Sequence, residues 1–298
     1  MYKVFKYTAE NKIEWDHFIA TAKNATFLFQ RDFMDYHQDR FEDFSLMVYK
    51  NETLYALLPA NKKNEVVYSH QGLTYGGLLL NNSAKLKQTF EAFKEIIKFL
   101  FENGILKLEV RLIPPFYNKL PSDELEYLFF KAAARLIKRD VVLLIDYHHQ
   151  LPFQKNRREG INKAKRKNLV VKTDDNYDLF WNEVLIPNLS SKYNTAPVHS
   201  LEEIKDLASK FPNHIRQVNV YQDNIIVAGT TVFLTDQVVH PQYVSAKANK
   251  NELGSLDLLY DFIIHEFKEN RNYFSFNTSS VENGELLNEG LVFWKESC

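Results

Sequence analysis

The order of predicted helices and strands in the first half of the chain recurs in the second half. The dipeptide Val48-Tyr49, in a strand-like run, is matched by Val220-Tyr221, and Val66-Val67 is matched by Val238-Val239. Both matches are 172 positions apart. Because elements in the same order share nearly the same offset, the sequence predicts an internal duplication. The chain should therefore fold as the same unit built twice.

Each half is predicted to contain helices, antiparallel strands, a long amphipathic helix and a further strand. In the first half the expected strands are 44–49, 54–59, 66–69, 105–112 and 141–147, with helices at 83–104 (capped by Ser83) and 122–138. In the second half helices are expected at 177–189, 201–210 and from Gly254-Ser255, with strands at 215–221, 225–234, 238–245 and 273–276. We predict an α+β fold with domains at 1–150 and 173–298, each a mostly antiparallel mixed sheet flanked by helices. Residues 151–172 should form a basic connector helix between them.

Composition excludes several classes of protein. The 298 residues carry 37 Lys and Arg against 38 Asp and Glu, so the net charge of -1 excludes DNA binding through bulk charge. Cys298 is the one cysteine, which excludes a disulfide framework or a cysteine zinc site. Residues 1–15 contain no apolar signal core, and the longest aliphatic run, 141–145, is far shorter than the roughly 20 residues of a membrane span. We expect a soluble cytoplasmic protein.

Familiar catalytic and metal-binding motifs are missing. His265-Glu266 begins like a zinc-protease motif, but Glu269 stands where the second histidine is needed. His148-His149 are adjacent and should point to opposite sides of a strand. The sequence has no Gly-x-Ser-x-Gly, Walker or Gly-x-Gly-x-x-Gly motif. We therefore expect no metal site, and no hydrolase triad, NTPase or Rossmann dinucleotide site.

Four stretches together resemble a known superfamily. They are 69–77 (SHQGLTYGG), 157–166 (RREGINKAKR), 240–243 (HPQY) with 254–259 (GSLDLL), and 274–282 (FSFNTSSVE) with 288–291 (NEGL) and 295–296 (KE). They resemble the GNAT superfamily, and more closely the tandem GNAT-like proteins related to the FemAB-type peptidoglycan-bridge aminoacyltransferases. The resemblance covers most of the chain and is not specific for one substrate.

The resemblance implies an acyl- or aminoacyl-transferase that passes an activated acyl group to an amine. In that class a backbone N–H at a splayed strand polarises the donor carbonyl, and positioning supplies most of the rate. The resemblance implies an acyl-CoA or aminoacyl-tRNA donor, no permanently bound cofactor, and a small-molecule or peptide-precursor acceptor of the bacterial cell wall.

The alternative is a catalytically inactive GNAT-like module that binds a peptide or cell-wall precursor. Ser275 and Asn277 stand where the family commonly has an aspartate and a glycine, and the chain ends soon after Glu296. The loop that grips acyl-CoA in this superfamily is matched only by 251–256, where Leu256 replaces a small residue.

The connector helix is the sharpest charge feature of the sequence. Arg158, Asn162 and Arg166 recur at four-residue spacing and so share one helix face. Facing a cleft, they could hold a phosphate-bearing donor or acceptor, including a tRNA end. The equally weighted alternative is a solvated helix whose charges bind nothing specific.

The start of the second long helix is a candidate anion site. Free backbone N–H groups and the helix dipole converge at Gly254-Ser255, where a pyrophosphate or carboxylate could bind. The favoured alternative is an ordinary N-cap by Ser255, with Asp257 well placed in the first turn.

The glycine-bearing segment of the first half is a candidate substrate site. His70, Tyr75 and Gly76 stand at the expected sheet edge, where glycine lets a substrate approach closely. The alternative is a tight turn or bulge that needs positive φ.

The matching strand of the second half supplies the candidate catalytic residues. Alternation places His240 and Gln242 on one face and Tyr243 on the other. His240 is the candidate general base, Tyr243 should lie beside the reacting centre, and Gln242 should contact substrate. A purely structural role for His240 is the commoner alternative for a lone strand histidine.

Overall fold

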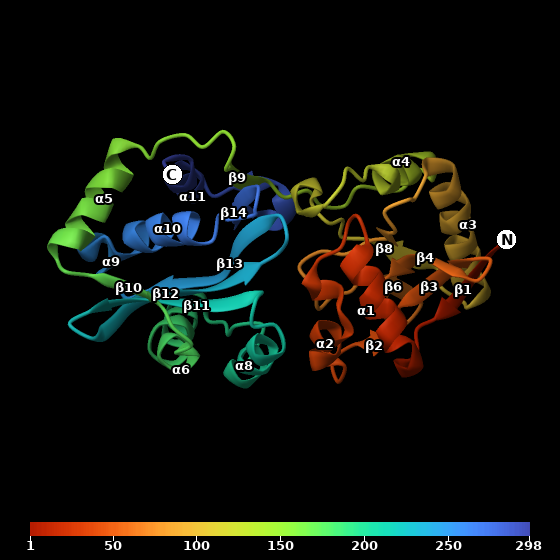
Figure 1. The fold of residues 1–298 in the computed structure, drawn as a ribbon, viewed down its shortest axis with the longest axis horizontal. Coiled ribbons are helices and arrows are strands. Elements are labelled where there is room, and N and C mark those ends of the chain that lie inside the picture. The colour runs from red at the N-terminus through yellow and green to blue at the C-terminus, as the bar shows by residue number, and fades with distance from the viewer. The chain divides into compact units, whose positions relative to one another are not determined.

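The computed structural model describes residues 1–298, apart from the side chain of Tyr193, and divides into two compact units, 1–135 and 136–298 (Figure 1). The first unit is therefore shorter than the predicted domain 1–150. Strand β9 (Val142–Asp146) pairs antiparallel with β14 (Tyr273–Thr278) and so joins the sheet of the second unit. Its apolar sequence predicts a buried strand, but it carries no signal for which sheet the strand enters.

The first unit contains two small sheets with strand orders β1-β3-β4-β7 and β2-β5-β6-β8. Helix α3 buries Phe93, Ile96 and Leu100 in the core of this unit, against residues of both sheets. The strands are β1 (Tyr2–Lys6), β2 (Glu42–Asp43), β3 (Leu46–Lys50), β4 (Thr53–Leu58), β5 (Asn61–Lys63), β6 (Val66–Tyr68), β7 (Leu79–Leu80) and β8 (Lys107–Glu109). The α-helices are α1 (Lys12–Thr21), α2 (Arg31–Met34), α3 (Leu86–Glu102) and α4 (Glu124–Lys131).

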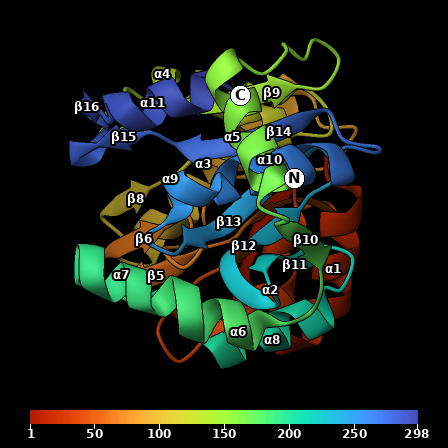
Figure 2. The same cartoon turned by 90° about the vertical axis from the view of Figure 1, so that its left-hand side faces the viewer.

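The second unit has one larger sheet with strand order β10-β11-β12-β13-β14-β9. Helix α10 lies on one face of the sheet with α5 packed against it, whereas α6 and α8 contact the sheet from the other side (Figures 1 and 2). The remaining strands are β10 (Val170–Thr173), β11 (Ile215–Gln222), β12 (Ile225–Leu234), β13 (Val238–Ala246), β15 (Ser280–Val281) and β16 (Leu286–Leu287). The helices are α5 (Lys155–Arg166), α6 (Tyr177–Phe180), η5 (Trp181–Leu185), α7 (Ile186–Tyr193), α8 (Leu201–Lys210), α9 (Lys250–Leu253), α10 (Ser255–Glu266) and α11 (Glu289–Glu296).

Strand register shows the duplication at the predicted offset. The β3/β4 hairpin has a register shift at Val48/Tyr49, and the β11/β12 hairpin has one at Val220/Tyr221. Each unit also has a parallel strand pair, which begins at Val66 with Lys107 in the first unit. The pair in the second unit begins at Val238 with Tyr273, again 172 positions after Val66 on the first strand. The predicted fold class, two mixed units of mostly antiparallel sheet flanked by helices, is confirmed.

Two predicted helices differ from the structure at their ends. Helix α3 begins at Leu86 with Lys85 as its N-cap, so Ser83 is not the cap. The helix predicted to reach residue 138 ends at Lys131, because Ala133 adopts a left-handed conformation and the Ala134 N–H bonds back to the Phe129 carbonyl. This is the pattern of a Schellman stop. The sequence has no glycine there to predict it.

The helical run predicted at 177–189 continues to Tyr193 but contains a π turn, η5. The π turn directly precedes Pro187, which has no N–H and cannot bond to the preceding turn of an α-helix. A widened turn is a common way to accommodate such a break.

Candidate functional site

The central strands of the second unit diverge. Parallel pairing between β13 and β14 is confined to Val238 with Tyr273 and Val239 with Phe274. Beyond this point β13 continues against β12, and β14 continues against β9. We call this divergence the β13/β14 fork. It comprises four residues that follow the last parallel pairs on the two strands, and a lysine of α11 that donates hydrogen bonds to β14: His240, Gln242, Ser275, Asn277 and Lys295.

A β-bulge re-aims the side chains of β13 at the fork. The register with β12 passes from Val232–Pro241 to Thr231–Tyr243, so Gln242 is the extra residue and leaves the regular ladder. Tyr243 is thereby paired with Thr231, and His240 with Phe233. Because cross-strand partners share a face, the bulge brings Tyr243 to the face of His240. The predicted alternation, with Tyr243 on the opposite face, is wrong for this reason.

His240 is buried, with 4% of its surface exposed. Its Nε2 lies 3.1 Å from Gln242 Oε1, so the two residues predicted to lie together do so. Burial, opposed by the Gln242 hydrogen bond and helped by the charge of Lys295, lowers the pKa of His240 to about 4. The imidazole is therefore neutral at pH 7 and a weak base, which does not suit the predicted role of general base.

Lys295 of α11 inserts its ammonium group at the fork and is 5% exposed. Its Nζ donates to the carbonyl oxygens of Asn277 (3.0 Å) and Thr278 (2.8 Å) and to Ser279 Oγ (2.8 Å). Burial lowers its pKa to about 8. The fork therefore contains a buried cation at neutral pH. Lys295 belongs to one of the stretches that carry the family resemblance, but nothing in the local sequence pattern indicates that its side chain is buried.

Tyr243 has a histidine partner that the sequence did not indicate. The Tyr243 hydroxyl accepts a hydrogen bond from the His199 backbone N–H (3.2 Å) and contacts the His199 ring at Nδ1. Its ring packs edge-on against Trp181 at a centroid distance of 5.0 Å. Burial raises the pKa of Tyr243 to about 12, so the phenol stays protonated at neutral pH.

The equivalent place in the first unit is filled by the chain itself. After the parallel pairing of β6 and β8, Gly76 forms a parallel bridge with Leu112, and its N–H donates to the Arg111 carbonyl at 2.7 Å. A Cβ on Gly76 would lie 2.1 Å from the Ser69 carbonyl oxygen, which explains the glycine. Backbone therefore occupies the space between the strands of this unit.

The other predicted substrate residues of the first unit are buried. His70 has a left-handed backbone (φ 68°), and burial lowers its pKa to about 3. Tyr75 is 3% exposed, and its hydroxyl lies 3.1 Å from Thr26 Oγ1. Both residues have the surroundings of structural side chains in a tight turn, as in the alternative interpretation of this segment.

The start of α10 is covered by α5. Gly254 has φ 70°, and a Cβ on it would lie 2.2 Å from the Gly160 carbonyl oxygen. Ser255 is fully buried and makes no capping hydrogen bond, so the N-cap is Gly254 and not Ser255. Asp257 in the first turn forms an ion pair with Arg157. The predicted anion site at Gly254 and Ser255 is thus occupied by a neighbouring helix and an acidic side chain of the protein.

The predicted face of the basic helix is only partly assembled. Arg158 and Asn162 line a cavity of about 540 Å³ together with Lys165, three residues after Asn162. Arg166 is exposed and is not among the residues that line it. The 12-residue helix packs on α10 through Gly160, Ile161 and Ala164, so it is part of the second unit and covers one of its helices.

Comparisons with known proteins show the fold. No family model and no curated protein sequence matches the chain. Among solved structures, the crystal structure of FemX superposes with a TM-score of 0.67 at 8% identity, over 99% of this chain and 93% of FemX. The chain has the FemX fold. Two further structures have TM-scores of 0.58.

These two structures differ in what their names state. One is the C-terminal domain of a putative lysylphosphatidylglycerol synthetase from Agrobacterium fabrum, with 10% identity over 91% of this chain and 80% of that one. The other is a conserved protein of unknown function from Bacteroides thetaiotaomicron, with 11% identity over 100% of this chain and 95% of that one. The likeness to FemX confirms the fold that the resemblance to FemAB-related proteins implied.

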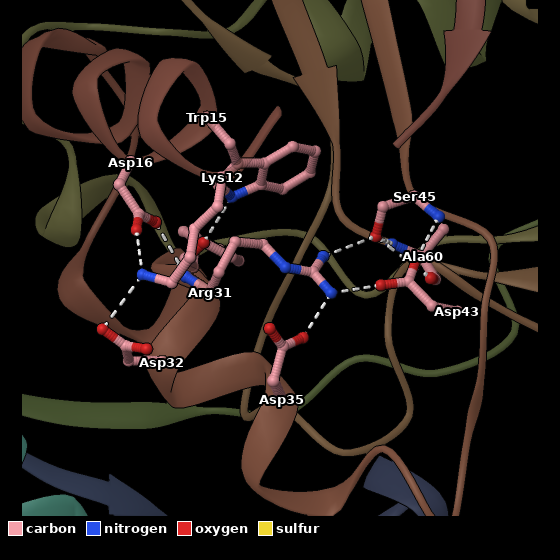
Figure 3. Close-up of polar contacts among 10 residues, drawn as sticks. Lys12, Trp15, Asp16, Arg31, Asp32, Asp35, Asp43, Ser45 and Ala60 are labelled. Atoms are coloured by element: carbon pink, nitrogen blue, oxygen red, sulfur yellow. Dashed lines mark hydrogen bonds and ion pairs between the residues drawn. The ribbon is translucent and has the colours of Figure 1, made fainter. Parts of the chain in front are cut away.

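A buried arginine in the first unit of the FemX fold is neutralised internally (Figure 3). Arg31 is 3% exposed and donates to the carboxylates of Asp35 and Asp43, and its guanidinium lies 3.9 Å from the centre of the Tyr7 ring. Its other terminal nitrogen lies 3.4 Å from Ser45 Oγ. Both terminal nitrogens of Arg31 are thus bonded within the protein, and the side chain holds the loop before β3.

Two negative findings apply to the described part of the chain. No group of three His, Cys, Asp or Glu side chains there is placed to bind a metal ion. No helix in it combines the length and the apolar character needed to cross a bilayer.

Proposed function

We propose that this protein is an acyl- or aminoacyl-transferase and that the reaction takes place at the β13/β14 fork of the second unit. The observation that carries the proposal is the buried Lys295 ammonium beside a bulged, diverging strand pair. A bulge releases backbone groups from the ladder, and a buried cation stabilises negative charge far better than an exposed one. All three N–H donors of Lys295 are bonded to Asn277, Thr278 and Ser279, so the ammonium would act through its charge on a carbonyl oxygen that becomes negative during acyl transfer.

The reaction that suits these groups is direct transfer. The nitrogen of an acceptor amine attacks the donor carbonyl carbon, the new N–C bond forms, and the bond from that carbon to the ester oxygen of the donor breaks. The proton lost by the amine passes to the departing oxygen. His240 is too weakly basic and Tyr243 too weakly acidic to be ionised at neutral pH, so we assign them the role of shaping and positioning the site.

The covered start of α10 argues against an acyl-CoA donor. In a GNAT-type site the pyrophosphate would bind at this helix start, but here the Gly160 backbone and the Asp257 carboxylate stand there. A pyrophosphate there would meet the Gly160 carbonyl oxygen and the Asp257 carboxylate. We therefore propose an aminoacyl ester, such as an aminoacyl-tRNA, as the donor. The acceptor would be an amine on a small molecule or on a peptide precursor of the cell wall.

The alternative of an inactive binding module loses part of its support at Asn277. This residue adopts φ 62°, the left-handed conformation for which glycine is the usual choice and which asparagine tolerates. With asparagine in place of glycine, the backbone at position 277 can therefore keep the left-handed φ/ψ region. Ser275 is buried, and its Oγ accepts the Asn277 N–H at 3.2 Å, which supports that turn.

The test is transfer of a labelled aminoacyl group from a mixture of aminoacyl-tRNAs to a UDP-linked muropeptide, with labelled acetyl-CoA as the competing donor. Lys295→Met should lower transfer by on the order of 10²-fold or more, a typical effect of removing one charge-stabilising group. Lys268→Met, at an exposed lysine of the same unit, is the matched control and should stay within about twofold of the parent. Far-UV circular dichroism checks that both variants are folded.

Equal transfer by Lys295→Met and the parent protein would contradict the assignment of the fork. Transfer from acetyl-CoA but not from aminoacyl-tRNA would contradict the proposed donor class. Binding of the muropeptide without transfer from either donor would favour the inactive module.

A further inference from the structure

An open cavity of about 540 Å³ beside α5 shares no residue with the fork. It is lined by the loop that leads into α5, by α5 itself and by the second half of α10. Its volume falls within the range of small-molecule sites. The residues that line it are Gln150, Leu151, Pro152, Phe153, Arg158, Ile161, Asn162, Lys165, Asp261 and His265.

One wall of the cavity is cationic. Arg158 and Lys165 stand two helical turns apart on α5, and Asn162 lies between them. Neither cationic side chain has an ion pair or hydrogen bond to any other residue that the structure describes, whereas the neighbouring Arg157 is neutralised by Asp257. A guanidinium with free donors matches the oxygens of a phosphate group.

The other lining residues include two aromatic rings and one acid. Phe153 and His265 pack edge to face, with ring centroids 6.2 Å apart. His265 Nδ1 lies 2.7 Å from the Asp261 carbonyl oxygen, which fixes the ring on α10. The Asp261 carboxylate would repel a bare anion, but it can accept hydrogen bonds from the hydroxyl groups of a larger ligand. A fitting ligand must therefore carry a phosphate, a planar ring and a hydroxyl-bearing part between them.

We infer that this cavity binds a nucleotide, with its phosphate at Arg158 and Lys165, its base against Phe153 and His265, and its sugar hydroxyls at Asp261. A free nucleotide and the terminal nucleotide of an RNA strand present this same chemistry. The inference does not depend on the proposed transfer reaction, because none of these residues belongs to the fork.

The test is isothermal titration calorimetry of the full chain at low salt with four probes: AMP, adenosine, inorganic phosphate and a short single-stranded RNA. AMP should bind more tightly than adenosine or phosphate. Arg158→Gln and Lys165→Gln should each weaken AMP binding by about tenfold or more, since each removes a charge-assisted contact. Phe153→Ala should weaken AMP and adenosine binding but leave phosphate binding unchanged.

Two controls separate this site from other effects. Arg166→Gln removes an equally exposed cation from the same helix outside the cavity and should leave AMP binding within about twofold. Lys295→Met, which tests the fork, should also leave it unchanged. An equal fall of AMP affinity in Arg166→Gln and Arg158→Gln would show non-specific electrostatic attraction to the basic helix and would overturn the inference. The absence of measurable binding of both AMP and RNA would also overturn it. Tighter binding of the RNA than of AMP would assign the site to an RNA end.

Discussion

Helix α5 reaches α10 only because two glycines meet, and replacing one of them should be costly. Gly254 has a left-handed backbone, and its added Cβ would lie 2.2 Å from the Gly160 carbonyl oxygen. Gly254→Ala therefore combines two penalties. A left-handed alanine costs about 1–2 kcal/mol, and forcing a methyl group into a packed contact costs about 1–3 kcal/mol.

The sum predicts a loss of about 2–5 kcal/mol from the stability of the second unit, a large part of the 5–15 kcal/mol typical of a whole domain. The clash is with a backbone atom, so a side-chain rotation does not relieve it. The helix contact itself must open, and Ile161 and Ala164 of α5 must move away from the core that they share with α10. The variant should therefore lose protection in α5 before the sheet unfolds.

Hydrogen exchange measured by mass spectrometry separates these contributions by segment. Gly104→Ala is the matched control, because Gly104 has φ 73° and no atom within 4 Å of the added Cβ, so it should cost only the backbone term in its own unit. Gly290→Ala, whose Cβ would have 3.8 Å of clearance, should be nearly neutral. If Gly254→Ala costs no more than Gly104→Ala, or if α5 keeps its protection, the close approach of the two helices is not as described.

Three further predictions concern buried charged or titratable groups. Arg31→Met should lower the free energy of unfolding by about 1–3 kcal/mol in urea titrations, because two partly exposed carboxylates lose their cation. Lys12→Met is its control and should cost about 1 kcal/mol or less, because solvent reaches both of its ion pairs. Folding lowers the pKa of His240 from 6.5 to about 4, so the unfolded chain takes up this proton before the folded chain does. Stability should therefore fall as the pH drops from 6.5 to 4. His240→Gln should reduce that loss, measured as melting temperatures from pH 7 to 4. The pKa of Lys295 is lowered from 10.5 to about 8, so the folded chain releases this proton before the unfolded chain does, and stability should rise with pH between these values. Lys295→Met should flatten that rise in melting temperatures measured from pH 8 to 10.5.

The sequence predicts the repeated architecture well, because matched residue pairs in the two halves are separated by the same number of positions. The matched pairs at Val48-Tyr49 and Val220-Tyr221 are the positions where both hairpins change register. Local irregularities of the strands have no such signal in the sequence. Nothing in the alternation of β13 indicates that Gln242 is an extra residue, and this single bulge changed the face of Tyr243.

The site was only partly predictable for a related reason. His240 and Gln242 were placed together correctly because their contact is local, two residues apart on one strand. Lys295 depends on three acceptors supplied by a strand end 16 to 18 positions earlier, and burial of a lysine is decided by tertiary structure. The anion site failed because Gly160 and Gly254 meet across 94 positions of sequence, and each alone is compatible with an ordinary turn or helix.

The two copies of the fold are closed in different places. Leu80 and Ala246 are equivalent, because they pair with Ala56 and Ala228, which are 172 positions apart. In the first unit Val66 and Leu80 are 14 positions apart, whereas their counterparts Val238 and Ala246 are 8 apart. The six additional residues include Gly76, which closes the space between the first unit's strands.

The second unit keeps its strands apart but has α5 over the start of α10. Under the proposed function, the fork has a buried cation but no open pyrophosphate site at the start of α10, so the donor would have to be held elsewhere along a longer molecule. The cationic face of α5 that lines the cavity is the place in the same unit where such a molecule would be held.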